Sequence, residues 1–167
     1  MTTTSATRSI EIHAPVKAVF AFVSDPVKAT EAVPWGHGKI TVGDIRTAEN
    51  GALTGYRYTG SMAVGPLHFQ MHSDVKVTEY VPNRRYVEHS SGEVATLALE
   101  STGDGTRLTF TVAVSSRIPL MDKVKVLVGT EGRGQARNMD MVLAEVKKRV
   151  EAEAVKSRPT DSAALRP

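Results

Sequence analysis

The residues best placed to do chemistry are three hydroxyl side chains at otherwise apolar positions of the chain. Tyr56 and Tyr58 share one face of an expected strand, and Ser73 is the polar member of an apolar alternation. A buried hydroxyl needs a hydrogen-bond partner. Each of the three therefore either has a partner inside the protein or points at a ligand.

Other side chains could complete a binding site around these hydroxyls. Gln135 and Asn138 lie within a turn of Met139 on the expected last helix and could present amides inward, although Asn138 could equally face solvent. Trp35, the only tryptophan, lies in a Gly/Pro loop, where it lines a cavity mouth or plugs the core. The expected apolar walls of the site are Phe69, Met71, Phe110, Met139 and Leu143.

Spacing and composition argue against several other chemistries. The chain has no cysteine, which removes disulfides, thiolate nucleophiles and cysteine metal sites. His68 and His72 are four residues apart, about 13 Å on a strand, which is too far for two ligands of one ion. The chain lacks a Gly-x-Ser-x-Gly elbow, and its glycines between 129 and 134 lack the Lys-Ser/Thr of a phosphate loop. We therefore expect no metal and no cofactor.

Length, composition and charge are those of one globular domain. The 167 residues are 41% hydrophobic and 23% charged. With 21 basic against 18 acidic residues the imbalance is too small to imply a nucleic-acid partner, and the basic cluster at 147–149 is interpreted as a solvated helix face. The opening residues resemble neither a signal peptide nor an anchor, so we expect a cytoplasmic protein without stable membrane insertion.

The elements that must position these residues begin with a strand that runs into two helices. Ile10 and Ile12 alternate with polar residues, and Pro15 then sets the first turn of a helix. Apolar residues follow on one face of that helix, and Asp25 is expected to cap a second short helix that begins at Pro26. The apolar face consists of Val16, Val19, Phe20 and Val23.

About ninety residues of strand follow, and then one long helix. The expected strands are 39–46, 53–59, 67–77, 84–90, 94–100 and 106–116, joined by short turns as an antiparallel meander. From about residue 120 the period is helical, with an apolar stripe from Met139 to Val150 and a break, kink or hinge at the glycines of 129–134. We expect a flexible start at 1–6, one domain at 7–155 and a disordered tail at 156–167.

Three stretches of the chain resemble the START/Bet v 1-like (SRPBCC) superfamily, in particular its polyketide cyclase/dehydrase and lipid-transport branch. They are SIEIHAPVKAVFAFVSDP, VTEYVPNRRYVEH and GDGTRLTFTV. The resemblance implies an α+β helix-grip fold, in which a seven-stranded antiparallel sheet wraps round a long C-terminal helix and two short helices follow the first strand. It also implies an internal cavity that holds a hydrophobic small molecule.

The resemblance bears on Tyr80 as well. Members that cyclise aromatic polyketides carry a pocket arginine just before the Val-Pro corner, where this chain has Tyr80, which could donate a hydrogen bond or act as a general acid. Parity places Tyr80 opposite Val77, so it faces inward only if the strand contains a bulge.

Three functions follow from these observations. The favoured one is an enzyme that cyclises or dehydrates a polyketide-type intermediate by positioning and proton transfer, with Tyr58, Tyr80 and Ser73 as catalytic residues. The alternatives are a non-catalytic carrier or sensor of a lipid or apolar metabolite, and a protein-interaction module with an exposed apolar patch. Either a monomer or a homodimer is compatible with the sheet edges.

Overall fold

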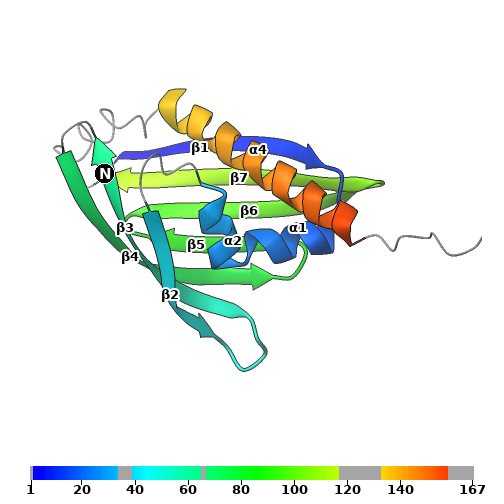
Figure 1. Cartoon of the computed structure of the whole chain (residues 1–167), viewed down its shortest axis with the longest axis horizontal. Helices are drawn as coiled ribbons and strands as arrows, with labels where there is room; N and C mark the ends of the chain where they lie inside the picture. The colour runs from blue at the N-terminus through cyan, green and yellow to red at the C-terminus, as the bar shows by residue number, and fades with distance from the viewer. Residues whose placement is uncertain (1, 34–38, 65–66, 117–132, 158–167) are drawn as a thin grey trace, which may run out of the picture.

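Residues 2–33, 39–64, 67–116 and 133–157 are described by the computed structural model of the chain. Seven antiparallel strands form one curved sheet in the order β1-β7-β6-β5-β4-β3-β2, which confirms the predicted α+β helix-grip fold (Figure 1). The strands are β1 (Thr2–Ile12), β2 (Lys39–Thr47), β3 (Leu53–Val64), β4 (Leu67–Val81), β5 (Arg85–Ser90), β6 (Glu93–Thr102) and β7 (Gly105–Ser116). The helices in these ranges are α1 (Val16–Val23), α2 (Pro26–Glu31) and α4 (Arg133–Lys156).

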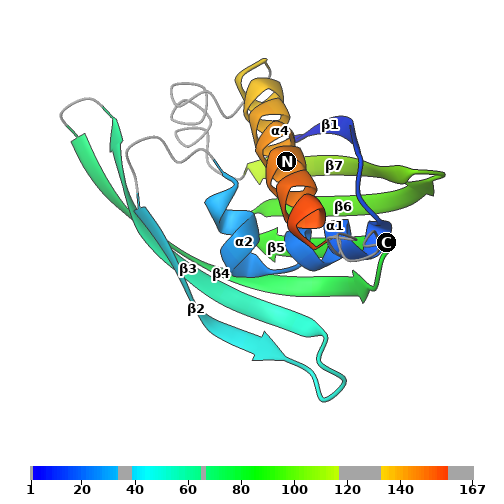
Figure 2. The same cartoon turned by 45° about the vertical axis from the view of Figure 1, so that its right-hand side comes forward.

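The helices lie on the concave side of the sheet. Figure 2 shows α4 running beside β1 and β7, while α1 and α2 lie in front of the middle strands. Trp35 and the glycines at 129 and 132 lie outside the described residues, as does 158–167 of the expected tail, whereas Gly134 lies in α4. The prediction of a flexible start at 1–6 is wrong for residues 2–6, because they pair with β7 as the first part of β1, and the expected tail begins too early, because Lys156 still belongs to α4. Across the described part of the chain, none of the helices has the length and apolarity that a membrane crossing requires.

The two short helices form where the sequence predicts them. Val19, Phe20 and Val23 are buried, and Phe22 adds a fourth buried side chain that the predicted stripe did not include. Pro15 occupies the N-cap position of α1 and therefore precedes its first turn. The carboxylate of Asp25 accepts the backbone N–H groups of Val27 and Lys28 at 2.9 and 3.2 Å, which confirms the predicted cap of α2.

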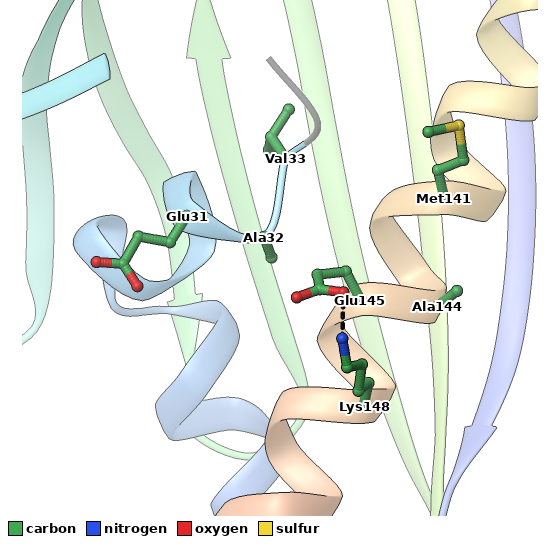
Figure 3. Close-up of a pocket in the computed structure, with 7 residues that line it drawn as sticks. All are labelled: Glu31, Ala32, Val33, Met141, Ala144, Glu145 and Lys148. Atoms are coloured by element: carbon green, nitrogen blue, oxygen red, sulfur yellow. Dashed lines mark ion pairs between the residues drawn. The ribbon is translucent and has the colours of Figure 1, made fainter. Parts of the chain in front are cut away.

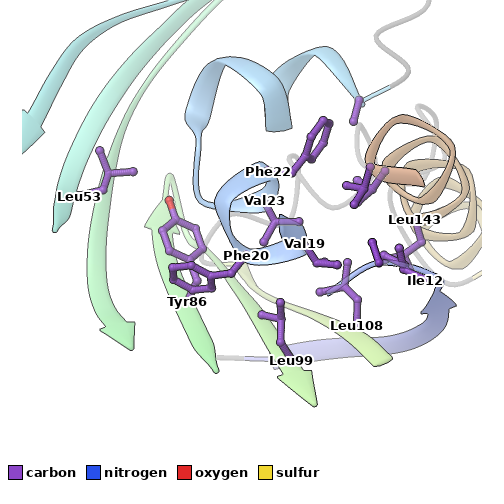
Figure 4. Close-up of a cluster of buried hydrophobic side chains, with 14 of the residues drawn as sticks. Ile12, Val19, Phe20, Phe22, Val23, Leu53, Tyr86, Leu99, Leu108 and Leu143 are labelled. Carbon is purple, nitrogen blue, oxygen red and sulfur yellow. The ribbon is translucent and has the colours of Figure 1, made fainter. Parts of the chain in front are cut away.

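The core lies between α1, α4 and the sheet. Figure 4 shows the side chains of α1 between Leu143 on one side and the strands on the other. Met139, Leu143, Val146 and Val150 of α4 are buried, which confirms the predicted stripe. Because these side chains recur at helical spacing, one face of α4 packs inward along most of its length.

Strand β4 contains an irregularity that decides which way its end faces. Between 67 and 77, the even-numbered side chains are exposed and Ser73, Val75 and Val77 are buried, as the alternation predicts. The pairing with β5 then shifts register between Val77 and Glu79. This bulge turns Tyr80 to the same side as Val77, where its ring packs against α1.

Polar contacts tie the C-terminal half of α4 to the end of β1. Lys147 Nζ donates to the backbone oxygen of Glu11 at 2.6 Å. The carboxylate of Glu151 accepts the backbone N–H of His13 at 2.8 Å. Lys147 is therefore engaged with β1, which corrects the prediction that the whole basic cluster is a solvated face.

Ion pairs tie the same half of α4 to α2. Nη1 of Arg149 lies 3.1 Å from Oε2 of Glu31, and Nζ of Lys28 lies 3.1 Å from Oε2 of Glu153. Lys148, by contrast, has a side chain that is 78% exposed, as predicted for the cluster. Each ion pair is partly exposed, so its individual contribution to stability is modest, at most about 1 kcal/mol.

Candidate functional site on the concave face

The concave face of the sheet carries two rows of side chains beneath the helices. Strand pairing places the first row in the order Val112, Ala95, Glu88 and Val77. The second row is Phe110, Leu97, Tyr86 and Tyr80. Phe110, Leu97, Tyr80 and Glu88 keep part of their surface accessible although they face inward. These four side chains are therefore only partly covered by their neighbours.

A carboxylate held by two tyrosines lies in the middle of this apolar face. The hydroxyl groups of Tyr56 on β3 and Tyr86 on β5 both donate to Oε2 of Glu88, each at 3.0 Å. Both tyrosines are buried, with 6% and 2% of their surface exposed. The pairing of strands β3 to β5 thus brings together three groups that the sequence separates by up to 32 residues.

Burial shifts the acid–base properties of all three groups. Desolvation raises the pKa of Glu88 above its usual range, and the two tyrosine hydrogen bonds, which favour the charged form, lower it by less. Burial likewise raises the pKa of Tyr56 and of Tyr86, and the neighbouring Glu88 raises both further. The tyrosines therefore remain proton donors, while Glu88 binds its proton more tightly than an exposed glutamate does.

Ser73 and Tyr58 form a second polar group beside the first. They are direct partners across β3 and β4, and Ser73 is buried with 5% of its surface exposed. The Oγ atom of Ser73 lies 3.1 Å from Oγ of Ser91, in the turn between β5 and β6. The buried hydroxyl thus has an internal partner, one of the two alternatives that its position in the sequence left open. Tyr58 is partly buried against the core.

Tyr80 lies on the α1 side of Tyr86. The ring centroids of these two residues are 6.2 Å apart with the planes at 80°, and Phe20 contacts Tyr80 in the same edge-on manner. Tyr80 is therefore connected to the Glu88 group through the ring of Tyr86.

The remaining predicted site residues separate into three groups. Phe110 lies on the concave face opposite Leu97, whereas Met139 and Leu143 are buried on α4 with 3% and 2% exposed. Asn138 is exposed, which settles its open alternative in favour of solvent. The backbone of Phe69 and Met71 in β4 and of Gln135 in α4 is described, but their side chains are not. Trp35 lies wholly outside the described residues.

A groove opens between α2 and α4 in the helical layer (Figure 3). Its volume is about 440 Å³, within the usual range for small-molecule sites. None of the predicted site residues lines it. Its lining combines apolar and charged side chains, namely Glu31, Ala32, Val33, Met141, Ala144, Glu145 and Lys148.

Glu88, Tyr86 and Ser91 are the site residues that the sequence interpretation missed. The alternation of Tyr86, Glu88 and Ser90 along the predicted strand 84–90 could have found Tyr86 and Glu88, because it puts them on one face. Ser91 lies in the turn after this strand, where the alternation does not reach. The histidines His68 and His72 are both exposed, as expected for the outer face. Within the described ranges, His, Asp and Glu side chains form no group of three that could hold a metal ion.

Comparison with known proteins adds a family and a fold. The chain matches the family described as polyketide cyclase / dehydrase and lipid transport over residues 3–151. No curated protein matches it significantly. Identities to the solved structures that follow are below 25%, so they show the shared fold alone.

Three solved structures illustrate that fold. The protein TTHA0849 from Thermus thermophilus is similar at 14% identity with a TM-score of 0.63, over 90% of this chain and 99% of its own. A START superfamily protein from Mycobacterium smegmatis gives 12% identity and a TM-score of 0.58, over 91% of this chain and 97% of its own. Ara h 8.0201 gives 13% identity and a TM-score of 0.58, over 90% and 99%.

Proposed function

Because the chain belongs to the polyketide cyclase / dehydrase and lipid transport family, within the START/Bet v 1-like superfamily, we propose that it is an enzyme acting on a polyketide-type intermediate. Family membership indicates the coarser property, binding of a hydrophobic ligand in a START-like fold. The finer proposal is that the ligand lies on the concave face and is cyclised or dehydrated there by positioning and proton transfer.

The observation that carries this proposal is the set of polar groups on an otherwise apolar face, several of whose side chains are only partly covered by their neighbours. Tyr58, Ser73 and Tyr80 lie on adjacent strands on either side of the Tyr56–Glu88–Tyr86 group. An apolar surface holds a flexible chain in one conformation, which alone can lower a barrier by several kcal/mol. Hydroxyl groups beside it then supply or accept protons.

In this proposal Tyr58, Tyr80 and Ser73 contact the reacting part of the substrate. Tyr80 and Tyr58 present hydroxyl groups that can polarise a ketone or protonate a leaving hydroxyl. Phe110 provides apolar wall on the same face, whereas Met139 and Leu143 shape the site from α4. The contributions of Trp35, Phe69, Met71 and Gln135 stay predictions from the sequence.

The test begins with the ligand and proceeds to turnover. Native mass spectrometry of protein gently purified from its own host identifies any bound molecule, which is then supplied to wild type, Tyr58→Phe, Tyr80→Phe and Ser73→Ala. We expect wild type to convert the molecule. A variant that lacks a residue that transfers a proton should convert it more slowly, by a factor of about 10² or more. Ser9→Ala on the outer face is the matched control, since the hydroxyl of Ser9 pairs with that of Thr109 across the strands.

A carrier or sensor is the second candidate, and a specific observation favours it. The hydroxyl groups of Tyr56, Tyr86 and Ser73 are all paired within the protein, as hydroxyls with a purely structural role would be. A carrier returns its ligand intact, so unchanged ligand after prolonged incubation, together with unaltered binding in the Tyr58→Phe and Tyr80→Phe variants, would overturn the enzyme proposal. If the purified protein carries no bound molecule and binds no apolar compound, the result would instead favour a protein-interaction module.

A further inference from the structure

The carboxylate of Glu88 is asymmetric in its contacts. Both tyrosine hydroxyls donate to Oε2, and among the described residues no hydrogen bond reaches Oε1. An ionised carboxylate accepts several hydrogen bonds, and in an apolar setting an unused lone pair carries a large desolvation penalty. Among the described groups of this face, Oε1 is therefore a polar atom with a strong requirement for a partner.

Buried neighbours enclose Glu88 within the sheet. Its neighbours across the strands, Val77 and Ala95, are 8% and 7% exposed, and the flanking Tyr56 and Tyr86 are buried as well. Glu88 nevertheless keeps partial accessibility. Since its strand and ring neighbours are buried beside it, the accessible surface of Glu88 is expected on the concave side, where the proposed function places the ligand.

We propose that Oε1 of Glu88 recognises the polar end of the ligand, and that this end is a neutral O–H group of an alcohol, phenol or enol and not a carboxylate. This inference rests on the proposed function and names the substrate class for the same site. An O–H donor completes the hydrogen bonding of Oε1, and hydrogen bonds to charged groups in apolar surroundings are strong. A ligand carboxylate would bring a second negative charge against the first.

The two tyrosines give this recognition its direction. Because they fix Oε2 from β3 and from β5, the carboxylate plane is held and Oε1 points to one place above the sheet. A donor bound there transfers its proton, if at all, to Oε1, so an enol or an activated alcohol is the group whose reaction this arrangement assists.

Three naphthalene compounds of equal apolar body test the inference. They are 2-naphthol, which has an O–H donor, 2-methoxynaphthalene, which has only an acceptor, and 2-naphthoate, which is an anion. Dissociation constants are measured by fluorescence titration at pH 8, where 2-naphthol is mostly neutral. We expect wild type to bind 2-naphthol about tenfold more tightly than 2-methoxynaphthalene, and 2-naphthoate most weakly.

Glu88→Gln converts the recognition point from acceptor to donor. The amide oxygen can still receive both tyrosine hydroxyls, which places the NH₂ group where Oε1 lay. We expect the preference for 2-naphthol over 2-methoxynaphthalene to fall to within about twofold, and 2-naphthoate to gain affinity. Glu100→Gln, a change of the same kind on the outer face with a side chain 71% exposed, should leave all three constants unchanged.

A measurement on wild type alone guards against a misfolded variant. In protein labelled with ¹³C at the glutamate carboxyl, 2-naphthol should shift one buried carboxyl resonance, and 2-methoxynaphthalene should shift it much less. Equal affinities for 2-naphthol and 2-methoxynaphthalene, preference for 2-naphthoate, or absence of that shift on 2-naphthol binding would overturn the inference while leaving hydrophobic binding intact. Failure of all three compounds to bind would count against the proposed function, and the inference, which rests on that function, would then also be rejected.

Discussion

The ring of Tyr80 meets the ring of Phe20 edge-on, with centroids 5.2 Å apart and planes at 76°. This contact joins the end of β4 to α1, and it exists because the bulge between Val77 and Glu79 turns Tyr80 inward. The packing uses the faces and edges of the rings and does not need the hydroxyl. The structural and chemical roles of Tyr80 are therefore separable by substitution.

Tyr80→Phe should leave stability within about 0.5 kcal/mol of wild type, while Tyr80→Ala should lower the free energy of unfolding by about 2–3 kcal/mol. The alanine variant loses the ring contacts with Phe20 and Tyr86 at a partly buried site. Urea unfolding followed by far-UV circular dichroism measures both. Equal losses in the two variants would show that the hydroxyl has a structural partner, which the ring-packing account does not include.

Replacing Glu88 should change how stability depends on pH. Because the pKa of Glu88 is raised in the folded protein, the folded state binds this proton more tightly than the unfolded chain does. The free energy of unfolding of wild type relative to Glu88→Gln is therefore highest at acidic pH. It falls as pH rises from the unfolded pKa near 4.5 through the folded value, and is constant above that.

Comparing the two proteins at each pH isolates this group. Asp74, Glu145 and Glu151 have lowered pKa values, caused first by hydrogen bonds to Arg46, to Arg149 and to the backbone of His13 respectively. Their contribution to the free energy of unfolding therefore increases as pH rises, opposite to that of Glu88. They are present in both proteins and cancel in the difference. A difference that rises with pH would contradict the assigned direction.

The turn between β5 and β6 allows a ranked set of variants. Ser91 has a φ of 41°, a left-handed conformation that costs a non-glycine residue roughly 1–2 kcal/mol, and its hydroxyl pairs with buried Ser73. Ser91→Ala keeps the strained backbone and leaves the buried hydroxyl of Ser73 without its partner, so it should lower the free energy of unfolding by about 1–2 kcal/mol. Ser91→Gly relieves the backbone while losing the same bond, so we expect a net change within about 1 kcal/mol.

Ser73→Ala completes this set. It removes the buried hydroxyl and leaves the exposed hydroxyl of Ser91 to water, so it should cost less than Ser91→Ala. Chemical denaturation of the three single variants gives the order. If Ser73→Ala were the most damaging, Ser73 would be making a contact beyond the one to Ser91.

Gly55 should not tolerate a methyl group. A Cβ there would lie 2.6 Å from the backbone oxygen of Val75 and 2.7 Å from Nη2 of Arg46, and the backbone atom cannot move aside without disturbing the sheet. We expect Gly55→Ala to destabilise by about 2–3 kcal/mol. Gly43→Ala is the matched control on the neighbouring strand, because nothing lies within 4 Å of its Cβ; it should stay within about 0.5 kcal/mol of wild type. Similar melting temperatures for the two variants would refute the steric argument.

Local sequence patterns predict the elements of this fold well. The alternation along β4, the helical spacing from Val16 to Val23 and the cap at Asp25 each depend on neighbours in the chain, and each is found as predicted. The strand after residue 53 is longer than predicted, because Gly60 continues in the ladder opposite Met71 instead of ending it.

The site is less predictable because it depends on relations across strands. Nothing near Thr78 announces a bulge, so the side to which Tyr80 turns could not be decided from parity. Glu88 follows two apolar residues, Tyr86 and Val87, which leaves the inward face of that short strand ambiguous. A glutamate is also most often a surface residue. Its inward position becomes evident only once the register with β4 and β6 is fixed.

The polar ties of α4 gather along one half of the helix, and that asymmetry governs how the helix fluctuates. From Lys147 to Glu153 four polar contacts join it to the end of β1 and to α2, whereas toward its start the contact between described residues is the single ion pair of Arg8 with Asp140. The first turns should therefore open more often than the last, and hydrogen exchange should be faster in 138–144 than in 147–153. Uniform exchange along the helix would contradict this. If the ligand lies on the concave face, as proposed, opening of the first turns would admit it to the sheet without unfolding the domain. We then expect the rate of ligand entry to depend on how firmly the other end of α4 is anchored.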